Sequence, residues 1–201
     1  MPYSNFNLKK VKDELHIGIV ENPGLFDPIG EVQISELLKT LLDEQVPLAV
    51  SINTEKARSE FIISNVLAEI RRRFSNKISL FSGIEFNVDK EKDLSGFCDF
   101  IISRSSEQLM LNSPVIVIVE AKNENIIGGL GQCIAEMIAA SIFNQQENNP
   151  VETIYGAVTS GTTWQFLRLR GNEAHIDLKE YFIDNPGKIV GILSSMVEQI
   201  A

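Results

Sequence analysis

Two apolar segments near the middle of the chain constrain its fold more than any other feature. Residues 97–103 and 115–121 are apolar at nearly every position, as in strands that are buried on both faces. Each segment nevertheless carries one carboxylate, Asp99 in the first and Glu120 near the end of the second. A buried charge is costly unless it is paired or bound to a metal, so these two positions are the first candidates for a functional site.

The segments around these runs alternate between helical and extended patterns. Thr54 can cap a helix, and after it apolar residues recur at helical spacing. From such patterns we expect helices at 35–44, 54–74, 132–143 and 186–200, and strands at 78–81, 84–88, 97–103, 115–121, 153–159 and 164–170. Residues 46–52 suit a short strand or a packing arm. Interleaved helices and apolar strands indicate an α/β fold, with a mixed central β-sheet flanked by helices.

The composition is that of an ordinary globular protein. The chain has 201 residues, 44% hydrophobic and 22% charged, which suits a single domain over 1–201. Cys98 and Cys133 lie in apolar runs and are interpreted as buried thiols in a reducing, cytoplasmic setting. Residues 1–10 are polar, unlike a secretory signal. The longest apolar run, 115–119, is too short to span a bilayer, so we expect no membrane partner.

The net charge of the chain is −9. This acidity argues against broad electrostatic binding of nucleic acid, which draws on many lysines and arginines. It does not exclude an enzyme that acts on nucleic acid, because carboxylates that hold a metal make a site acidic. Arg71, Arg72 and Arg73 follow one another in the chain, and they are interpreted as a solvated helix face rather than a DNA contact.

Alternation along a strand predicts how the acidic residues meet. Glu120 and Lys122 are two residues apart and therefore point to the same face. If the two apolar strands are neighbours, Asp99 approaches Glu120, and two such carboxylates favour a cation between them. Oxygen ligands suit Mg²⁺ or Mn²⁺. The Lys122 ammonium could orient or help to deprotonate a water, or stabilise negative charge on a phosphate. These groups together are suited to hydrolysis of a phosphodiester.

This arrangement resembles the PD-(D/E)XK, or restriction-endonuclease-like, nuclease superfamily. The resemblance rests on Asp99, an intervening stretch, and Glu120-Ala121-Lys122 at the end of an apolar strand. The residue before Asp99 is Cys98 rather than the proline of the family name. The implied core is a helix, three strands, a helix and a further strand over residues 54–170.

The ends of the chain lie outside this core, and the glycine cluster after the lysine needs a separate interpretation. Residues 1–53 would form an N-terminal helical extension, and residues 171–201 would add a C-terminal helix packed on the core. The cluster at 128–131 contains three glycines, but position 134 is Ile, which excludes a dinucleotide-binding GxGxxG. We expect these glycines to let the chain turn sharply out of the strand that carries Lys122.

Two further site residues are implied by the resemblance. Glu60 lies on the first core helix and would be a third metal ligand, and Gln132 lies on the helix after the lysine and would shape the site. In a regular helix of about 100° per residue, Leu67 lies only about 20° around the axis from Glu60, at the edge of the apolar stripe. A solvated Glu60 and a capping or packing role for Gln132 stay open as alternatives. Glu85 is a weaker acidic candidate.

The implied function is a Mg²⁺- or Mn²⁺-dependent endonuclease. Its roles would be Asp99 and Glu120 as metal ligands with Glu60, and Lys122 and Gln132 as catalytic groups. DNA is the expected substrate and RNA the less favoured one, and a homodimer would suit cleavage of two strands. One alternative is a nuclease-fold protein without activity that serves as a binding or regulatory module. Another is an unrelated α/β interaction protein, which would not bring Asp99, Glu120 and Lys122 together.

Overall fold

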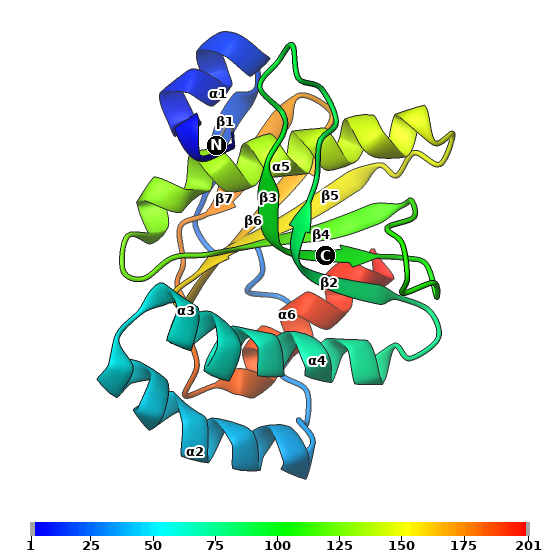
Figure 1. Ribbon diagram of the computed structural model, residues 1–201. Helices are drawn as coiled ribbons and strands as arrows, with labels where there is room; N and C mark the ends of the chain where they lie inside the picture. The colour runs from blue at the N-terminus through cyan, green and yellow to red at the C-terminus, as the bar shows by residue number, and fades with distance from the viewer. Residues whose placement is uncertain (1–2, 200–201) are drawn as a thin grey trace.

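A single mixed β-sheet forms the centre of the molecule (Figure 1). The computed structural model describes residues 3–199. The sheet has eight strands, with β8 attached beside β6 and the others in the order β1-β7-β6-β5-β4-β3-β2. These strands are β1 (Gly18–Asn22), β2 (Ser79–Glu85), β3 (Phe97–Ser103), β4 (Val115–Ala121), β5 (Thr153–Thr159), β6 (Thr163–Arg170), β7 (Glu173–Asp177) and β8 (Tyr181–Phe182). The expected α/β class with a mixed, helix-flanked sheet is confirmed.

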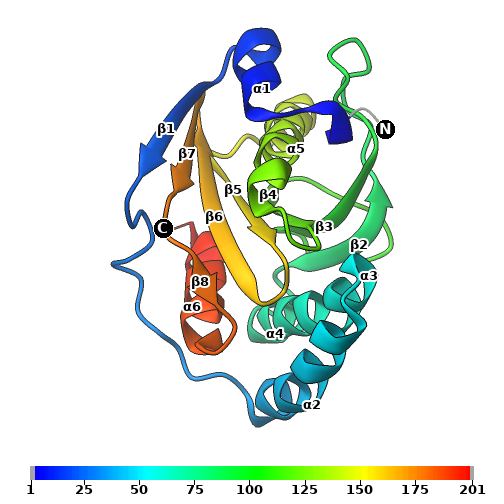
Figure 2. The ribbon, with the colours of Figure 1, turned by 90° about the vertical axis from the view of Figure 1, so that its left-hand side faces the viewer.

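Helices cover both faces of the sheet, as Figure 2 shows from the side. One face carries η1 (Tyr3–Asn5), α1 (Leu8–Leu15) and α5 (Ile126–Gln146), and the other carries α2 (Glu36–Ile52), α4 (Ser64–Arg73) and α6 (Pro186–Glu198). Each face has its own apolar core. Strand β4 lies between these cores, and all of its residues are buried, as its apolar sequence predicts.

Two helices in the first half of the chain differ from expectation. Helix α2 continues through Pro47 to Ile52, so the predicted strand or arm at 46–52 is wrong. Pro47 has no N–H to donate, so the Asp43 carbonyl lacks its usual partner in the helix. Both residues are exposed, and water can donate to that carbonyl. The predicted helix at 54–74 is divided into α3 (Glu55–Arg58), the π-helical turn η2 (Ser59–Ile63) and α4.

Helix α5 begins at Ile126, six residues before the expected start at 132. The glycines at 128–131 are therefore helical, and the expected sharp turn at them is wrong. They are needed for close packing instead. A Cβ at Gly131 would lie 2.4 Å from the Asn7 backbone, and one at Gly129 would lie 3.0 Å from Cγ of Lys122. The chain leaves β4 through residues 122–125, and the Asn125 side chain caps the helix.

The sheet extends beyond the expected core. Strand β1 pairs in parallel with β7, so residues 1–53 are not only helical, and residues 171–201 add β7 and β8 as well as α6. On the opposite side, the two strands expected at 78–81 and 84–88 are one strand, β2, which includes Gly83 at a positive φ. By length and apolarity alone, α5 could cross a membrane. Most of its length is buried against the sheet, as is usual for a core helix.

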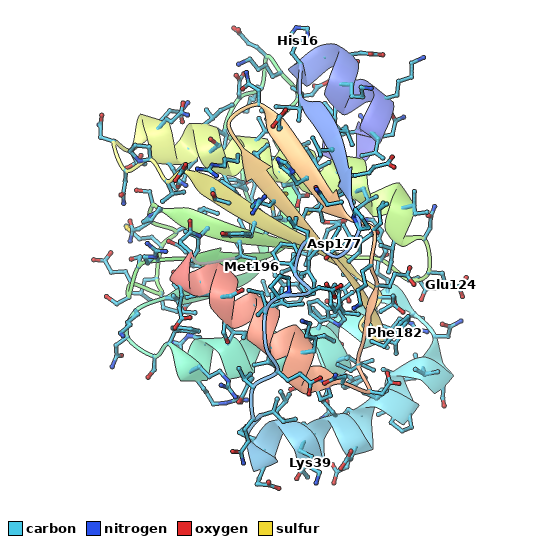
Figure 3. All side chains as sticks on the ribbon, turned by 180° about the vertical axis from the view of Figure 1, so that it is seen from behind. His16, Lys39, Glu124, Asp177, Phe182 and Met196 are labelled. Atoms are coloured by element: carbon cyan, nitrogen blue, oxygen red, sulfur yellow. The ribbon has the colours of Figure 1, made fainter. Side chains whose placement is uncertain are left out.

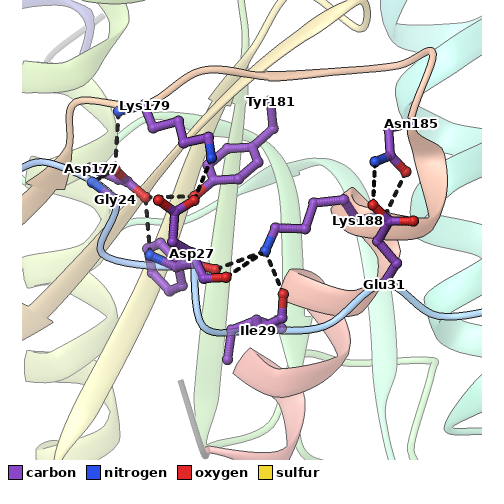
Figure 4. Close-up of polar contacts among 10 residues, drawn as sticks. Gly24, Asp27, Ile29, Glu31, Asp177, Lys179, Tyr181, Asn185 and Lys188 are labelled. Carbon is purple, nitrogen blue, oxygen red and sulfur yellow. Dashed lines mark hydrogen bonds and ion pairs between the residues drawn. The ribbon is translucent and has the colours of Figure 1, made fainter.

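One buried carboxylate ties the N-terminal loop to the end of β7. Asp177 is fully buried near the middle of the molecule, whereas Glu124 lies at the outer margin (Figure 3). Oδ1 of Asp177 accepts from the backbone N–H groups of Gly24 and Lys179, and Oδ2 accepts from Phe26 N–H and the Tyr181 hydroxyl (Figure 4). Both oxygens therefore face donors, which makes this carboxylate a structural anchor.

Replacement of Asp177 by Asn tests that anchor. Either orientation of the new amide directs its NH₂ group at a backbone N–H that donates in the native protein. We expect D177N to lower the free energy of unfolding by about 2 to 4 kcal/mol, measured by urea denaturation. Asp184 is exposed, and D184N is the matched control, with little expected change. Equal stability of D177N and the wild type would contradict the anchoring role.

Candidate active site

Asp99, Glu120 and Lys122 meet where β3 and β4 leave their regular pairing. The last paired residues are Phe100 and Val119, and Asp99 and Glu120 are the next residues on each strand. Oδ2 of Asp99 accepts from the backbone N–H of Ala121 at 2.8 Å. The Lys122 ammonium pairs with Oε1 of Glu120. The three residues are therefore neighbours, as the spacing in the sequence predicts.

The trio lies at the carboxyl end of β4. Strands β4 and β5 are parallel, and the backbone N–H of Lys122 extends this contact by donating to the Thr159 carbonyl at 2.8 Å. The carboxyl ends of neighbouring parallel strands are the usual position for sites in α/β folds. The backbone beneath the lysine is thus held by the sheet rather than by a free loop.

Burial and charge perturb both members of the ion pair. Burial, and then the nearby charge of Asp99, raise the pKa of Glu120 to about 8, although Lys122 opposes this. Burial disfavours the Lys122 ammonium, but the charge of Glu120 and the hydrogen bond to it outweigh burial and raise the pKa of Lys122. A carboxylate with a raised pKa gains from any cation placed beside it.

Gln132 extends from α5 to the Lys122 ammonium. Its Oε1 accepts from the Lys122 ammonium at 3.2 Å, and its Nε2 donates to Oε1 of Glu136 at 3.0 Å. Glu136 has no exposed surface. Burial, and then the charge of Glu120, raise its pKa well above the usual range. Sequence reasoning missed Glu136, although it interrupts an apolar run in the same way as Asp99.

A hollow of about 300 Å³ opens beside Asp99. Its lining residues come from α3, η2, β2, β3 and β4: Glu55, Lys56, Ser59, Glu60, Ser82, Gly83, Asp99 and Ala121. Helix α3 is anchored here because Arg58 is buried and donates to the Ser160 carbonyl and the Thr162 hydroxyl at 3.1 and 3.2 Å. The charge of Glu55 contributes to the raised pKa values of Glu120 and Lys122, so Glu55 is an acidic neighbour that sequence reasoning also missed.

Glu60 lines the hollow beside Asp99, and it forms an ion pair with another residue of that hollow. Its side chain is 53% exposed and pairs with Lys56 at 2.7 Å. The geometric expectation for Glu60 assumed a regular helix, but in η2 the Ser64 N–H bonds to the Ser59 carbonyl, five residues back. That π turn changes the angle between Glu60 and the apolar stripe. Glu60 thus shares the hollow with Asp99, while its carboxylate is paired with Lys56.

The carboxylates only partly form a metal site. Oε2 of Glu120 is buried without a hydrogen-bond partner among the described residues, which leaves an oxygen for a hard cation. Within residues 3–199, however, no group of three or more His, Cys, Asp or Glu side chains is arranged to hold a metal ion. Asp99 and Glu120 would offer a divalent ion at most two carboxylate ligands, so further ligands would have to come from water or substrate.

The remaining candidates have structural partners. Arg72 and Arg73 pair with the buried Glu69, and Arg71 donates to Gln108. These contacts hold the arginines on α4. Glu85 accepts from Asn87 and is not among the residues that line the hollow.

Both thiols are free and buried, as expected. Comparison with protein-family models, curated proteins and solved structures gives no match in any of the three.

The two buried glutamates predict a pH dependence of stability. Their folded pKa values lie above the ordinary 4.5, so the folded protein binds more protons than the unfolded chain above that pH. Stability should therefore be greatest below pH 4.5 for these groups and fall as pH rises toward 8, by up to about 1.4 kcal/mol per pH unit for each group. Urea denaturation across this range measures the slope.

Substitution of Glu136 by Gln should make that slope shallower, because one of the two titrating groups is removed. Glu147 is exposed at the end of the same helix, and E147Q should keep the wild-type slope. A pH-independent stability between 4.5 and 8, or equal slopes for E136Q and E147Q, would contradict the assignment of raised pKa values to these glutamates.

Proposed function

We propose that the protein is a metal-dependent phosphodiesterase of the PD-(D/E)XK type, an endonuclease that acts on DNA. The observation that carries the proposal is the buried, unpartnered Oε2 of Glu120 beside Asp99 and Lys122. An apolar strand has no structural use for an unpartnered carboxylate oxygen, whereas a divalent cation can be bound by it. The restriction-endonuclease-like core and the Mg²⁺ or Mn²⁺ cofactor are parts of the same proposal.

The roles follow from the contacts at the end of β4. Asp99 and Glu120 would hold the metal ion, which when bound supplies Lewis-acid activation of water and phosphate. Lys122 would stabilise negative charge on the phosphate, because its ammonium is held by Glu120 and Gln132 rather than by solvent. Gln132 limits the freedom of that ammonium. The net charge of −9 favours local recognition or a second copy of the chain over broad electrostatic binding of DNA.

A binding or regulatory protein with the same fold is the second candidate. The observation that favours it is the ion pair between Lys122 and Glu120, which occupies one oxygen that a metal would use, together with the absence of a third carboxylate in the set among residues 3–199. It predicts no Mn²⁺ binding in calorimetry and no cleavage.

Substitution of Lys122 by Met tests the catalytic role. The change keeps most of the apolar stem and removes the ammonium, so we expect cleavage of plasmid DNA in Mg²⁺ or Mn²⁺ to fall by about 10²-fold or more. Lys39 is exposed on α2, and K39M should cleave at the wild-type rate. If K122M cleaves DNA and RNA as fast as the wild type, the proposed mechanism is wrong.

Calorimetry with Mn²⁺ distinguishes the contributions of Glu55 and Glu60 to metal binding. Asp99→Asn should abolish binding because it neutralises one of the paired carboxylates. Glu55→Gln should weaken binding more than Glu60→Gln, since Glu55 acts on Glu120 whereas Glu60 pairs with Lys56. A larger loss in E60Q would restore Glu60 as the third ligand and contradict the assignment from the structure.

A further inference from the structure

Glu136 is a buried acid that the proposed chemistry does not use. It lies one turn after Gln132 on α5 and has no exposed surface. One oxygen accepts from Gln132, and the other has no hydrogen-bond partner among the described residues. A buried carboxyl group is costly, and an apolar side chain would fill this position on the sheet-facing side of α5 at lower cost. Its one hydrogen bond is with Gln132, which also contacts Lys122 at the candidate active site.

The contact with Glu136 determines how Gln132 is oriented. A glutamine amide has an oxygen that accepts and an NH₂ group that only donates. Because the Glu136 oxygen accepts from Nε2 at 3.0 Å, Oε1 of Gln132 is left facing the Lys122 ammonium at 3.2 Å. If Glu136 could not accept, the amide would be free to swing away from Lys122. Glu136 therefore orients Gln132, and Gln132 in turn contacts Lys122.

Helix α5 packs closely on the sheet beside Glu136. Gly156 of β5 lets the helix approach closely, since a Cβ there would lie 2.5 Å from Sδ of Met137 and 2.9 Å from Sγ of Cys133. These two residues flank the turn that carries Glu136. The turn of α5 that carries Glu136 therefore packs closely on β5, the strand paired with β4.

We propose that Glu136 is a positioning residue that acts through Gln132 to hold the Lys122 ammonium at the candidate active site. The proposal rests on the proposed function and adds a residue to it. Two of the three N–H groups of Lys122 are directed at Glu120 and Gln132, which leaves the third for a phosphate oxygen or a water. Loss of Glu136 lets the ammonium take other orientations without removing it.

The test compares Glu136→Met, which removes the acceptor, with Glu136→Gln, which keeps an oxygen for Gln132. E136M should lower kcat for Mn²⁺-dependent plasmid cleavage by about tenfold with little change in KM, and E136Q should retain the wild-type kcat. Gln132→Met interrupts the same series of contacts nearer to Lys122, and its kcat should match that of E136M. The double variant should be no slower than either single variant, because both act through one path.

A second measurement does not depend on activity. In metal-free protein with ¹³C-labelled lysine, the Lys122 side-chain resonance, assigned with K122M, should shift in E136M and Q132M alike but not in E136Q. An unmoved resonance in folded E136M would overturn the proposal, as would equal losses of kcat in E136M and E136Q or additive losses in the double variant. If the wild type cuts no nucleic acid, the proposed function fails, while the Lys122 resonance still tests Glu136. Q132M keeps the test available if E136M does not fold.

Discussion

The burial of β4 is the constraint on which the rest of the structure depends. Every residue of this strand is buried between two apolar cores, so both faces of the sheet must be covered by helices. The strand is also where the chain places Glu120. The low-polarity surroundings that stabilise the strand are what make its carboxylate costly. Stability of the centre and reactivity at its end therefore have a common origin.

The cost of burying the Glu120 carboxylate is reduced by a line of polar contacts rather than by solvent. Asp99 is tied to the backbone of β4, Glu120 to Lys122, and Lys122 through Gln132 to Glu136. The line crosses from the sheet into α5. Two acids in it have raised pKa values because burial disfavours their charged forms. An arrangement of this kind responds strongly to any added positive charge.

The parts of the site that lie on strands could be predicted from the sequence, and those that depend on helix geometry could not. Asp99 and Glu120 stand out because a strand alternates regularly and its neighbours are apolar. Glu136 gives a comparable signal within the helix predicted at 132–143, but its full burial depends on how closely α5 packs on the sheet, which residue spacing does not show. Glu55 could not be anticipated, since the π turn after it has no signal in residue spacing. The pairing of β1 with β7 joins segments too distant in sequence for any local pattern to predict.

The π turn in η2 gives the site a dependence on chain length as well as on residue type. A π turn is equivalent to one extra residue in an α-helix. Deletion of a single residue from Ser59–Ile63 would restore a regular helix and rotate α3 relative to α4 by about 100°. Glu55 would then leave the hollow with its identity unchanged. Among related chains, an insertion or deletion at this point would therefore remodel the acidic margin of the site more than most substitutions would.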